Sequence, residues 1–359
     1  MADDNELRDL LLRAVDLGAS DLHFVTGHPP IVRVHGEMRT LGDGPLSADH
    51  AHRQMLELCD ALTAEKFASG NNVDFALKLP IADGKQTQRF RANYFTADGE
   101  PGACFRVIPA EIPELDWAGF PFELAERLVG FRNGLVLVAG VTGAGKTTSL
   151  AMLVNLLNQS GGRRIITIEE PIEYVHARYR NSVVTQREVG RDVGSFSDGL
   201  KYGLRQDPDV LLVGEIRDPE TAKLALSAAE TGHLVLSTLH TRDAKGAITR
   251  MSDFFPEGMQ TEVRSQLSMS LRAVLSQHLV PGLEKGGKRE LAMEVMINNS
   301  PIASGIRQGR FETIDNNIQT GAADGMQTFD DAILSLLKRK RIGRDTAARF
   351  LKNADLLGW

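Results

Sequence analysis

The most constraining feature of the sequence is a glycine-rich octapeptide at residues 140–147, GVTGAGKT, which matches the pattern G-x-x-x-x-G-K-[ST] in full. An apolar run at 135–139 precedes it, and an apolar helical pattern that extends to Leu157 follows it. A strand, a tight turn and a helix N-terminus together place backbone N–H groups around a bound phosphate. We therefore expect a nucleotide site made of Gly140, Thr142, Gly143, Ala144, Gly145, Lys146, Thr147 and Thr148. Lys146 is expected to reach the β and γ phosphates of ATP, and the Thr147 hydroxyl to bind Mg²⁺.

Composition limits the remaining possibilities. The chain has 359 residues, which corresponds to about two domains, and its hydrophobic and charged fractions are ordinary for a soluble globular protein. A net charge of −6 argues against binding of nucleic acid through the overall charge of the protein. The two cysteines exclude a four-cysteine zinc site. No apolar run is long enough to span a bilayer, and the acidic start does not resemble a signal peptide. We therefore expect a cytoplasmic α/β protein that does not bind nucleic acid.

The distribution of apolar residues predicts two domains, at 1–110 and 123–359, joined by a proline-containing linker at 111–122. The first is expected to be a small α+β unit whose last two strands meet in a turn containing Asp98-Gly99 and Pro101-Gly102. In the second, short apolar runs alternate with helical patterns, which is typical of a buried parallel sheet. These runs lie at 135–139, 165–168, 210–213 and 233–239. After about residue 255 the apolar spacing predicts helices almost exclusively, including a stripe at Leu267, Leu271, Val274, Leu275 and Leu279.

Polar residues follow the other predicted parallel strands, where ligands of such sheets bind. Glu215 follows the run at 210–213 and is expected to activate the attacking water, with a water-mediated role at Mg²⁺; the alternative is a helix-capping acid. Glu169 follows 165–168 and is the next candidate for Mg²⁺ through water. His240 follows the last of these strands and is expected to sense the γ-phosphate. Several such groups beside one phosphate loop favour an ATPase site.

Together these segments resemble a known family. GVTGAGKTT (140–148), IEEPIEY (168–174), PDVLLVGEIRD (208–218) and ETGHLVLSTLHT (230–241) resemble the Walker A, Asp, Walker B and His boxes of the secretion ATPases. ASDLH (19–23), QREVG (186–190) and the QTG and GMQTF segments within 319–329 are similar to the type IV pilus retraction ATPases, the PilT/PilU group. The resemblance covers essentially the whole chain.

The resemblance implies an α/β fold with a PAS-like N-terminal domain and a RecA-like ATPase domain that carries a helical C-terminal part. It implies a cytoplasmic homohexamer, peripheral at the inner membrane, that hydrolyses ATP to drive pilus retraction. The implied partners are an inner-membrane pilus platform protein and a related pilus ATPase. It further implies that Arg91 and Arg106, on adjacent predicted strands, contact the γ-phosphate, where they would neutralise charge on the transferred phosphoryl group. The alternatives are two exposed strand arginines, or Arg89 in place of one of them.

The sequence departs from the family pattern at two positions. Glu170 stands where the Asp box usually has aspartate, and Ala303 replaces the arginine of an Ala-Ile-Arg-Asn-Leu-like segment. The replacement at Ala303 favours a PilU-like accessory motor over an autonomous one. Together the two departures also leave open a regulatory subunit that binds ATP but hydrolyses little. A type II secretion ATPase is a third reading, against which the compact N-terminal domain and the GMQTF segment argue.

Overall fold

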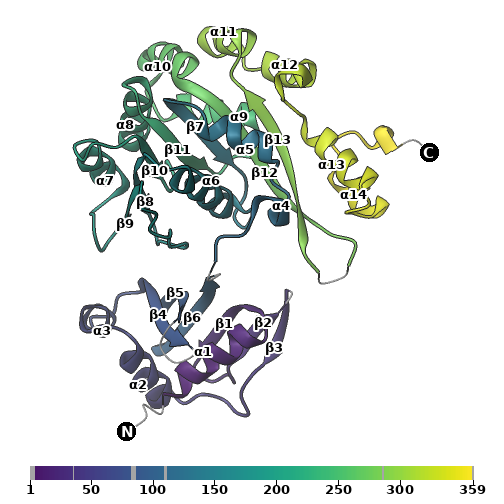
Figure 1. Cartoon of the computed structure of the whole chain (residues 1–359). Coiled ribbons are helices and arrows are strands. Elements are labelled where there is room, and N and C mark those ends of the chain that lie inside the picture. Colours follow the sequence, from purple (N-terminus) through teal and green to yellow (C-terminus); the bar gives the residue numbers. More distant parts are fainter. Residues whose placement is uncertain (1–4, 35, 82–85, 109–110, 285–286, 358–359) are drawn as a thin grey trace. The chain divides into compact units, whose positions relative to one another are not determined.

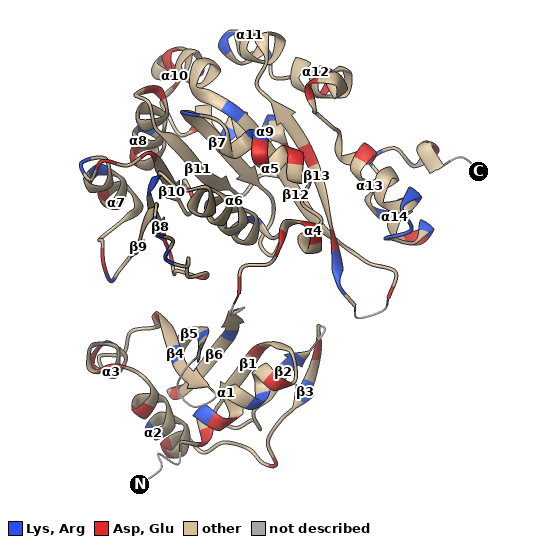
Figure 2. Cartoon of the chain, viewed as in Figure 1, with Lys and Arg blue, Asp and Glu red and all other residues tan. Residues whose placement is uncertain are grey.

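The computed structural model describes residues 5–34, 36–81, 86–108, 111–284 and 287–357. The chain divides into two compact units, Met1–Glu111 and Ile112–Trp359 (Figure 1). His35, Pro109 and Ala110, which fall in the predicted first domain, lie outside the described residues. Charged residues of both signs are spread over both units (Figure 2).

The first unit is an antiparallel sheet with three helices. Its helices are α1 (Glu6–Asp16), α2 (Ala48–Leu58) and α3 (Ala61–Ala68). Its strands follow the spatial order β3 (Glu37–Thr40), β2 (Ile31–Val34), β1 (Ala19–Val25), β6 (Glu100–Ile108), β5 (Gln86–Ala97) and β4 (Val73–Ile81). Asp98 and Gly99 form the two-residue turn between β5 and β6, and both have positive φ, which suits the twist of a tight hairpin. The expected β5–β6 hairpin is therefore present, but Pro101 and Gly102 pair with β5 as part of β6 and do not belong to the turn.

The second unit is built on a seven-stranded sheet in which only β13 runs antiparallel to its neighbour. The strand order is β13 (Arg289–Ile297), β12 (Leu271–Pro281), β7 (Gly134–Ala139), β11 (Leu234–Leu239), β10 (Val210–Val213), β8 (Arg164–Glu169) and β9 (Val183–Glu188). The four central strands β7, β11, β10 and β8 are almost wholly buried, which explains their continuous apolar sequences. The predicted α/β class, with a mainly parallel sheet in the second unit, is confirmed.

Helices surround this sheet and continue beyond it to the C-terminus (Figure 1). Those before and within the sheet are α4 (Leu115–Ala118), α5 (Phe122–Val129), α6 (Lys146–Ser160), α7 (Phe196–Gly203), α8 (Pro219–Glu230), α9 (Ala244–Asp253) and α10 (Glu257–Ser270). Those after it are α11 (Ser300–Gln308), α12 (Thr313–Thr320), η1 (Ala322–Asp324), α13 (Phe329–Lys338), α14 (Arg344–Phe350) and η2 (Ala354–Leu357). The last helices share a separate small core with β12 and β13, which includes Val280, Phe329 and Ile333.

The predicted helical stripe after residue 255 is partly wrong. Leu267 lies in α10, but the chain turns extended at Leu271, and the other four members of the stripe lie in β12. Parallel pairing of β12 with β7 decides the conformation, because it buries this apolar run in the sheet. Apolar spacing in a short run cannot distinguish the two conformations.

The expected linker is also more structured than the sequence suggested. Within residues 112–122, Leu115–Ala118 form α4, and Phe120 is 2% exposed in the main core of the second unit. Ile112 and Leu115 pack against the same core. Apolar anchors therefore attach most of this proline-containing segment to the second unit.

Candidate active site

The phosphate loop lies between β7 and α6, as its sequence predicts. Gly140, Gly143 and Gly145 all have positive φ, a conformation that side chains disfavour. A side chain at Gly140 would also meet the carbonyl oxygen of Gln277, at 2.7 Å from its Cβ. Close packing against β12 thus fixes where the loop begins. Residues 141–143 are exposed, which leaves their backbone accessible to a ligand.

Lys146 begins α6 and is only 8% exposed. Its Nζ donates to the carbonyl oxygens of Gly140 at 2.8 Å and Val141 at 3.2 Å, so the ammonium folds back onto the loop. Burial lowers the pKa of Lys146, and the nearby carboxylates of Glu215 and Glu173 partly offset that effect. A lysine held at the start of a helix beside a glycine-rich loop is placed to bind a phosphate.

The next two residues face different surroundings. The side chain of Thr147 is exposed, whereas Thr148 Oγ1 lies 3.0 Å from the hydroxyl of Tyr174. Thr147 therefore has the accessible hydroxyl, and Thr148 anchors α6 to the segment that follows β8.

His240 connects the phosphate loop to Glu215. Its Nδ1 lies 3.5 Å from Lys146 Nζ, and its Nε2 lies 3.4 Å from Glu215 Oε2. These contacts suit the tautomer in which Nδ1 accepts from the ammonium and Nε2–H donates to the carboxylate. The ends of β7, β10 and β11 thus place a lysine, a glutamate and a histidine in one connected group, as the strand-end argument predicted.

Arg217 holds the carboxylate of Glu215 from the other side. Its Nε lies 2.5 Å from Glu215 Oε1, and Nη2 donates to Oε2 at 3.0 Å. Its Nη1 donates to Glu170 at 2.8 Å, so one guanidinium joins both glutamates. Burial alone would raise the pKa of Glu215, but the hydrogen bonds and charges of Arg217 and His240 outweigh it and lower that pKa. Glu215 is therefore kept ionised.

Glu169 ends β8 and is 8% exposed. Its Oε1 accepts from Thr167 Oγ1 at 2.6 Å and from Gln186 Nε2 at 3.0 Å. The same Gln186 amide donates to the carbonyl of Tyr174 at 2.7 Å. The carboxylate is thus fixed by its own strand and by β9.

Arg91 and Arg106 lie directly opposite each other on β5 and β6 of the first unit. Their side chains are 39% and 58% exposed, and each has an acidic neighbour: Asp74 at 3.7 Å from Arg91, and Asp21 at 3.1 Å from Arg106. The competing Arg89 is only 8% exposed. Of the three arginines, Arg91 and Arg106 are therefore the pair whose charges are accessible.

Sequence reasoning missed several residues that support the site. Arg217 lies two positions after Glu215, but only the fold reveals that it also contacts Glu170. Gln277 is fully buried on β12, and its Nε2 donates to Ser149 Oγ on α6 at 2.7 Å. These contacts join distant parts of the chain, so no local pattern announces them. Asp218, by contrast, is the N-cap of α8 that its Asp-Pro-Glu-Thr sequence predicts: it accepts from the backbone N–H of Thr221 at 2.8 Å.

The described residues contain neither a metal-binding cluster of acidic, histidine and cysteine side chains nor a membrane-spanning helix. No group of three or more His, Cys, Asp or Glu side chains within them could hold a metal ion. Nor does any helix in the described ranges combine the length and apolar character needed to cross a membrane.

Comparison with known proteins shows extensive similarity. Residues 6–322 match the family described as "Type II/IV secretion system protein". The chain is 40% identical to the type IV pilus retraction ATPase PilT of Pseudomonas aeruginosa, over 95% of this chain and 97% of that protein. It is 36% identical to the type IV pilus ATPase PilU of the same species, over 98% and 90% of the two chains. A crystal structure of the pilus retraction motor PilT with bound ADP superposes with a TM-score of 0.86 at 38% identity, covering 98% of both chains.

Proposed function

The chain belongs to the type II/IV secretion system protein family, among its type IV pilus retraction ATPases, and we propose that it is an ATP-hydrolysing motor of pilus retraction. It is a P-loop ATPase that binds nucleotide, like the ADP-bound structure to which it is similar. The observation that carries the proposal is the connected group of Lys146, His240 and Glu215 at the ends of β7, β11 and β10.

Each residue of this group has a role in the proposed mechanism. Backbone N–H groups of the loop and the Lys146 ammonium bind the phosphates, and Lys146 exchanges its carbonyl partners for phosphate oxygens. Glu215 orients the attacking water and accepts its proton, since its carboxylate is ionised. His240 links Glu215 to Lys146 and so reports the γ-phosphate to the carboxylate.

The donor set also fits Mg²⁺. This ion prefers oxygen ligands and usually takes one or two protein groups, with phosphates and waters completing the octahedron. The exposed hydroxyl of Thr147 is the direct protein ligand in this proposal, while Glu169 and Glu215 act through water. Bound Mg²⁺ neutralises phosphate charge during hydrolysis.

The first unit contributes Arg91 and Arg106 in this proposal. Their accessible guanidinium groups contact the γ-phosphate and neutralise charge on the transferred phosphoryl group. The working assembly is a homohexamer that acts in the cytoplasm at the inner membrane, where it docks on a pilus platform protein. This assembly rests on the family relationship.

A second candidate is an accessory motor or a low-activity regulatory subunit. Arg217 occupies both oxygens of Glu215 and is tied to Glu170, the residue that departs from the family pattern. Such a clamp would slow hydrolysis by this chain alone. In that case a related pilus ATPase would supply most of the turnover.

Steady-state phosphate release with Mg-ATP tests the proposal, with wild type compared to Glu215→Gln. We expect the variant to bind ATP normally and to lose about 10²- to 10⁴-fold in turnover, because it lacks a base. Glu220→Gln, which removes an exposed carboxylate in the first turn of α8, is the matched control and should retain activity. Near-normal turnover of Glu215→Gln contradicts the assignment. Negligible turnover of wild type, with ATP bound, favours the accessory candidate.

A further inference from the structure

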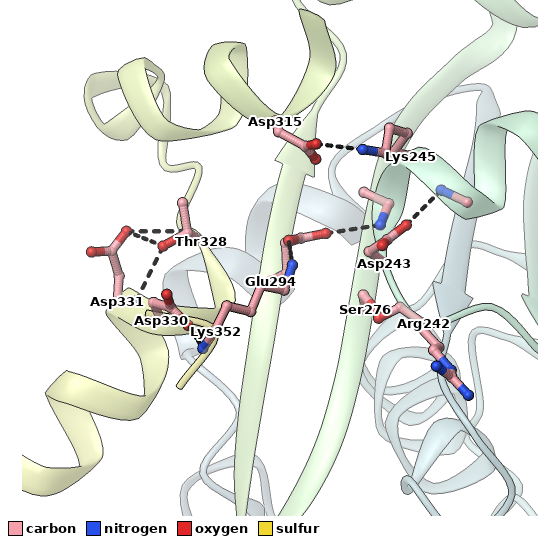
Figure 3. Close-up of polar contacts among 12 residues, drawn as sticks. Arg242, Asp243, Lys245, Ser276, Glu294, Asp315, Thr328, Asp330, Asp331 and Lys352 are labelled. Atoms are coloured by element: carbon pink, nitrogen blue, oxygen red, sulfur yellow. Dashed lines mark hydrogen bonds and ion pairs between the residues drawn. The ribbon is translucent and has the colours of Figure 1, made fainter. Parts of the chain in front are cut away.

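Strands β12 and β13 contact the C-terminal end of the loop that begins with His240 (Figure 3). This loop, residues 240–243, joins β11 to α9. Ser276 Oγ on β12 donates to the carbonyl oxygen of Arg242 at 2.8 Å. Glu294 on β13 accepts from the backbone N–H of Ala244 at 2.8 Å, and Asp243 caps α9 by accepting from Gly246 at 2.6 Å. The loop is therefore fixed at the end opposite to His240.

Glu294 is an unusual residue for its position. It is 5% exposed on an apolar strand, where an ionised carboxylate is costly unless it is paired. Burial, together with the nearby charges of Asp243 and Asp315, raises the pKa of Glu294; the hydrogen bond from Ala244 and the charge of Lys352 offset this only in part. Within the described ranges, its polar partners are the Ala244 N–H and, at 3.8 Å, the ammonium of Lys352.

The same carboxylate meets the C-terminal helices through Lys352. The backbone N–H of Lys352 donates to Asp330 in the first turn of α13 at 2.8 Å (Figure 3). Nearby, the ring of His278 on β12 packs against Phe329 with centroids 4.7 Å apart. Glu294 thus lies where the C-terminal helices, the strand pair and the start of α9 come together.

We propose that Glu294 is a positioning residue for the ATPase site: by anchoring the first turn of α9 it fixes loop 240–243, and so places His240 between Lys146 and Glu215. This inference rests on the proposed function for its effect on turnover. Its structural part stands on the contacts of residues 240–244 alone. Glu294 touches none of Lys146, His240 and Glu215 in the described contacts, so it acts through the loop.

Three variants separate positioning from general destabilisation. Glu294→Leu removes the acceptor for Ala244. Glu294→Gln keeps a carbonyl oxygen in the same place and removes only the charge. Glu290→Leu is the matched control: Glu290 lies four positions earlier on the same face of β13 and is 7% exposed, but it pairs with Arg341 at 2.9 and 3.1 Å rather than with the loop.

We expect kcat of Glu294→Leu to fall on the order of 10- to 100-fold through misplacement of His240, with ADP affinity unchanged because ADP lacks the γ-phosphate. Glu294→Gln should stay within about twofold of wild type, since it keeps the hydrogen bond. Amide hydrogen exchange should accelerate over residues 238–246 in Glu294→Leu and remain as in wild type there in Glu290→Leu.

Unchanged exchange over this segment in Glu294→Leu overturns the proposal, as does equal loss of turnover in Glu294→Leu and Glu290→Leu. If wild type itself shows no turnover, the proposed function fails, but the exchange measurement still decides whether Glu294 fixes the loop. If exchange changes as expected while kcat does not, the link from the loop to His240 is wrong.

Discussion

At the scale of single residues, the charged groups of the site are bound to protein partners that ATP must replace. The Lys146 ammonium donates to two loop carbonyls, and both oxygens of Glu215 contact Arg217. The phosphates of ATP offer Lys146 stronger, charge-assisted hydrogen bonds. The nucleotide offers Arg217 and Glu215 no comparable new partner when they separate. We therefore expect the Arg217–Glu215 contact to limit how readily Glu215 acts as a base.

The Arg217–Glu215 contact predicts a shift in the pH dependence of turnover. In Arg217→Gln the positive charge is lost, so the lowered pKa of Glu215 should rise. The acid limb of kcat/KM, where the base becomes protonated, should therefore move to higher pH. Glu170→Gln is the control, because it removes only the second partner of Arg217 and should move the limb less. An acid limb that stays in place in Arg217→Gln contradicts this account of Glu215.

A buried histidine predicts acid sensitivity of the second unit. Burial lowers the pKa of His176 from 6.5 to about 4, and its Nδ1 lacks a hydrogen-bond partner among the described residues. Between these values the unfolded chain binds the extra proton, so stability falls as pH falls from 6.5 towards 4, by up to about 3 kcal/mol. Urea unfolding at several pH values should show that His176→Leu loses this part of the decline. His28→Gln, at an exposed histidine, should keep it.

At the scale of elements, the sequence predicted those helices, strands and turns whose conformation depends on neighbouring residues in the chain. The phosphate loop, the buried parallel strands and the β5–β6 turn all have residue types that few other conformations accept. The strand β12 was missed because Leu271, Val274 and Leu275 suit a helical stripe as well as a strand, and only pairing with β7 settles the matter.

The same distinction applies to the site. Lys146, Glu215 and His240 were predictable, because each follows a recognisable strand. The supporting contacts Arg217–Glu170 and Gln277–Ser149 were not, because they depend on how distant elements pack. Supporting residues of this kind carry no pattern of their own in a single sequence.

Two glycines of the phosphate loop predict unequal effects of alanine. At Gly140 a Cβ would lie 2.7 Å from the Gln277 carbonyl and 3.0 Å from Ala144, in a left-handed conformation. At Gly143 the backbone is also left-handed, but nothing lies within 4 Å. Gly143→Ala should therefore cost only backbone strain, about 1–2 kcal/mol of unfolding free energy, and Gly140→Ala distinctly more. Equal costs in denaturant unfolding contradict the packing of the loop on β12.

At the scale of the whole molecule, the two units have separate apolar cores. The core of the first unit includes Leu22, Phe90 and Phe105, and that of the second includes Leu137, Leu153 and Val235. A nucleotide that binds only the folded state of a unit stabilises that unit against unfolding. The change in unfolding temperature of each unit therefore reports which unit the nucleotide contacts.

Calorimetry with nucleotides tests this division. We expect two unfolding transitions, one for each unit. Leu22→Ala should lower only the free energy of unfolding of the first unit, by about 2–5 kcal/mol. ADP should raise only the unfolding temperature of the second unit. A non-hydrolysable ATP analogue should raise the unfolding temperatures of both units, because Arg91 and Arg106 bind its γ-phosphate. The double variant Arg91→Ala/Arg106→Ala should abolish the increase for the first unit. Stabilisation of the first unit by ADP alone would argue against a γ-phosphate contact.

The position of β7 within its sheet has a consequence for synthesis of the chain. Its partners are β11 and β12, so Gly134 pairs with Leu234, and neither neighbour has left the ribosome when β7 emerges. At bacterial or eukaryotic elongation rates, roughly 5–20 s pass before the first partner appears. Throughout this interval a fully apolar strand has both edges unpaired, which is the condition for aggregation. Until residues 234–239 emerge, β7 therefore has neither of the neighbours that cover its edges in the folded sheet.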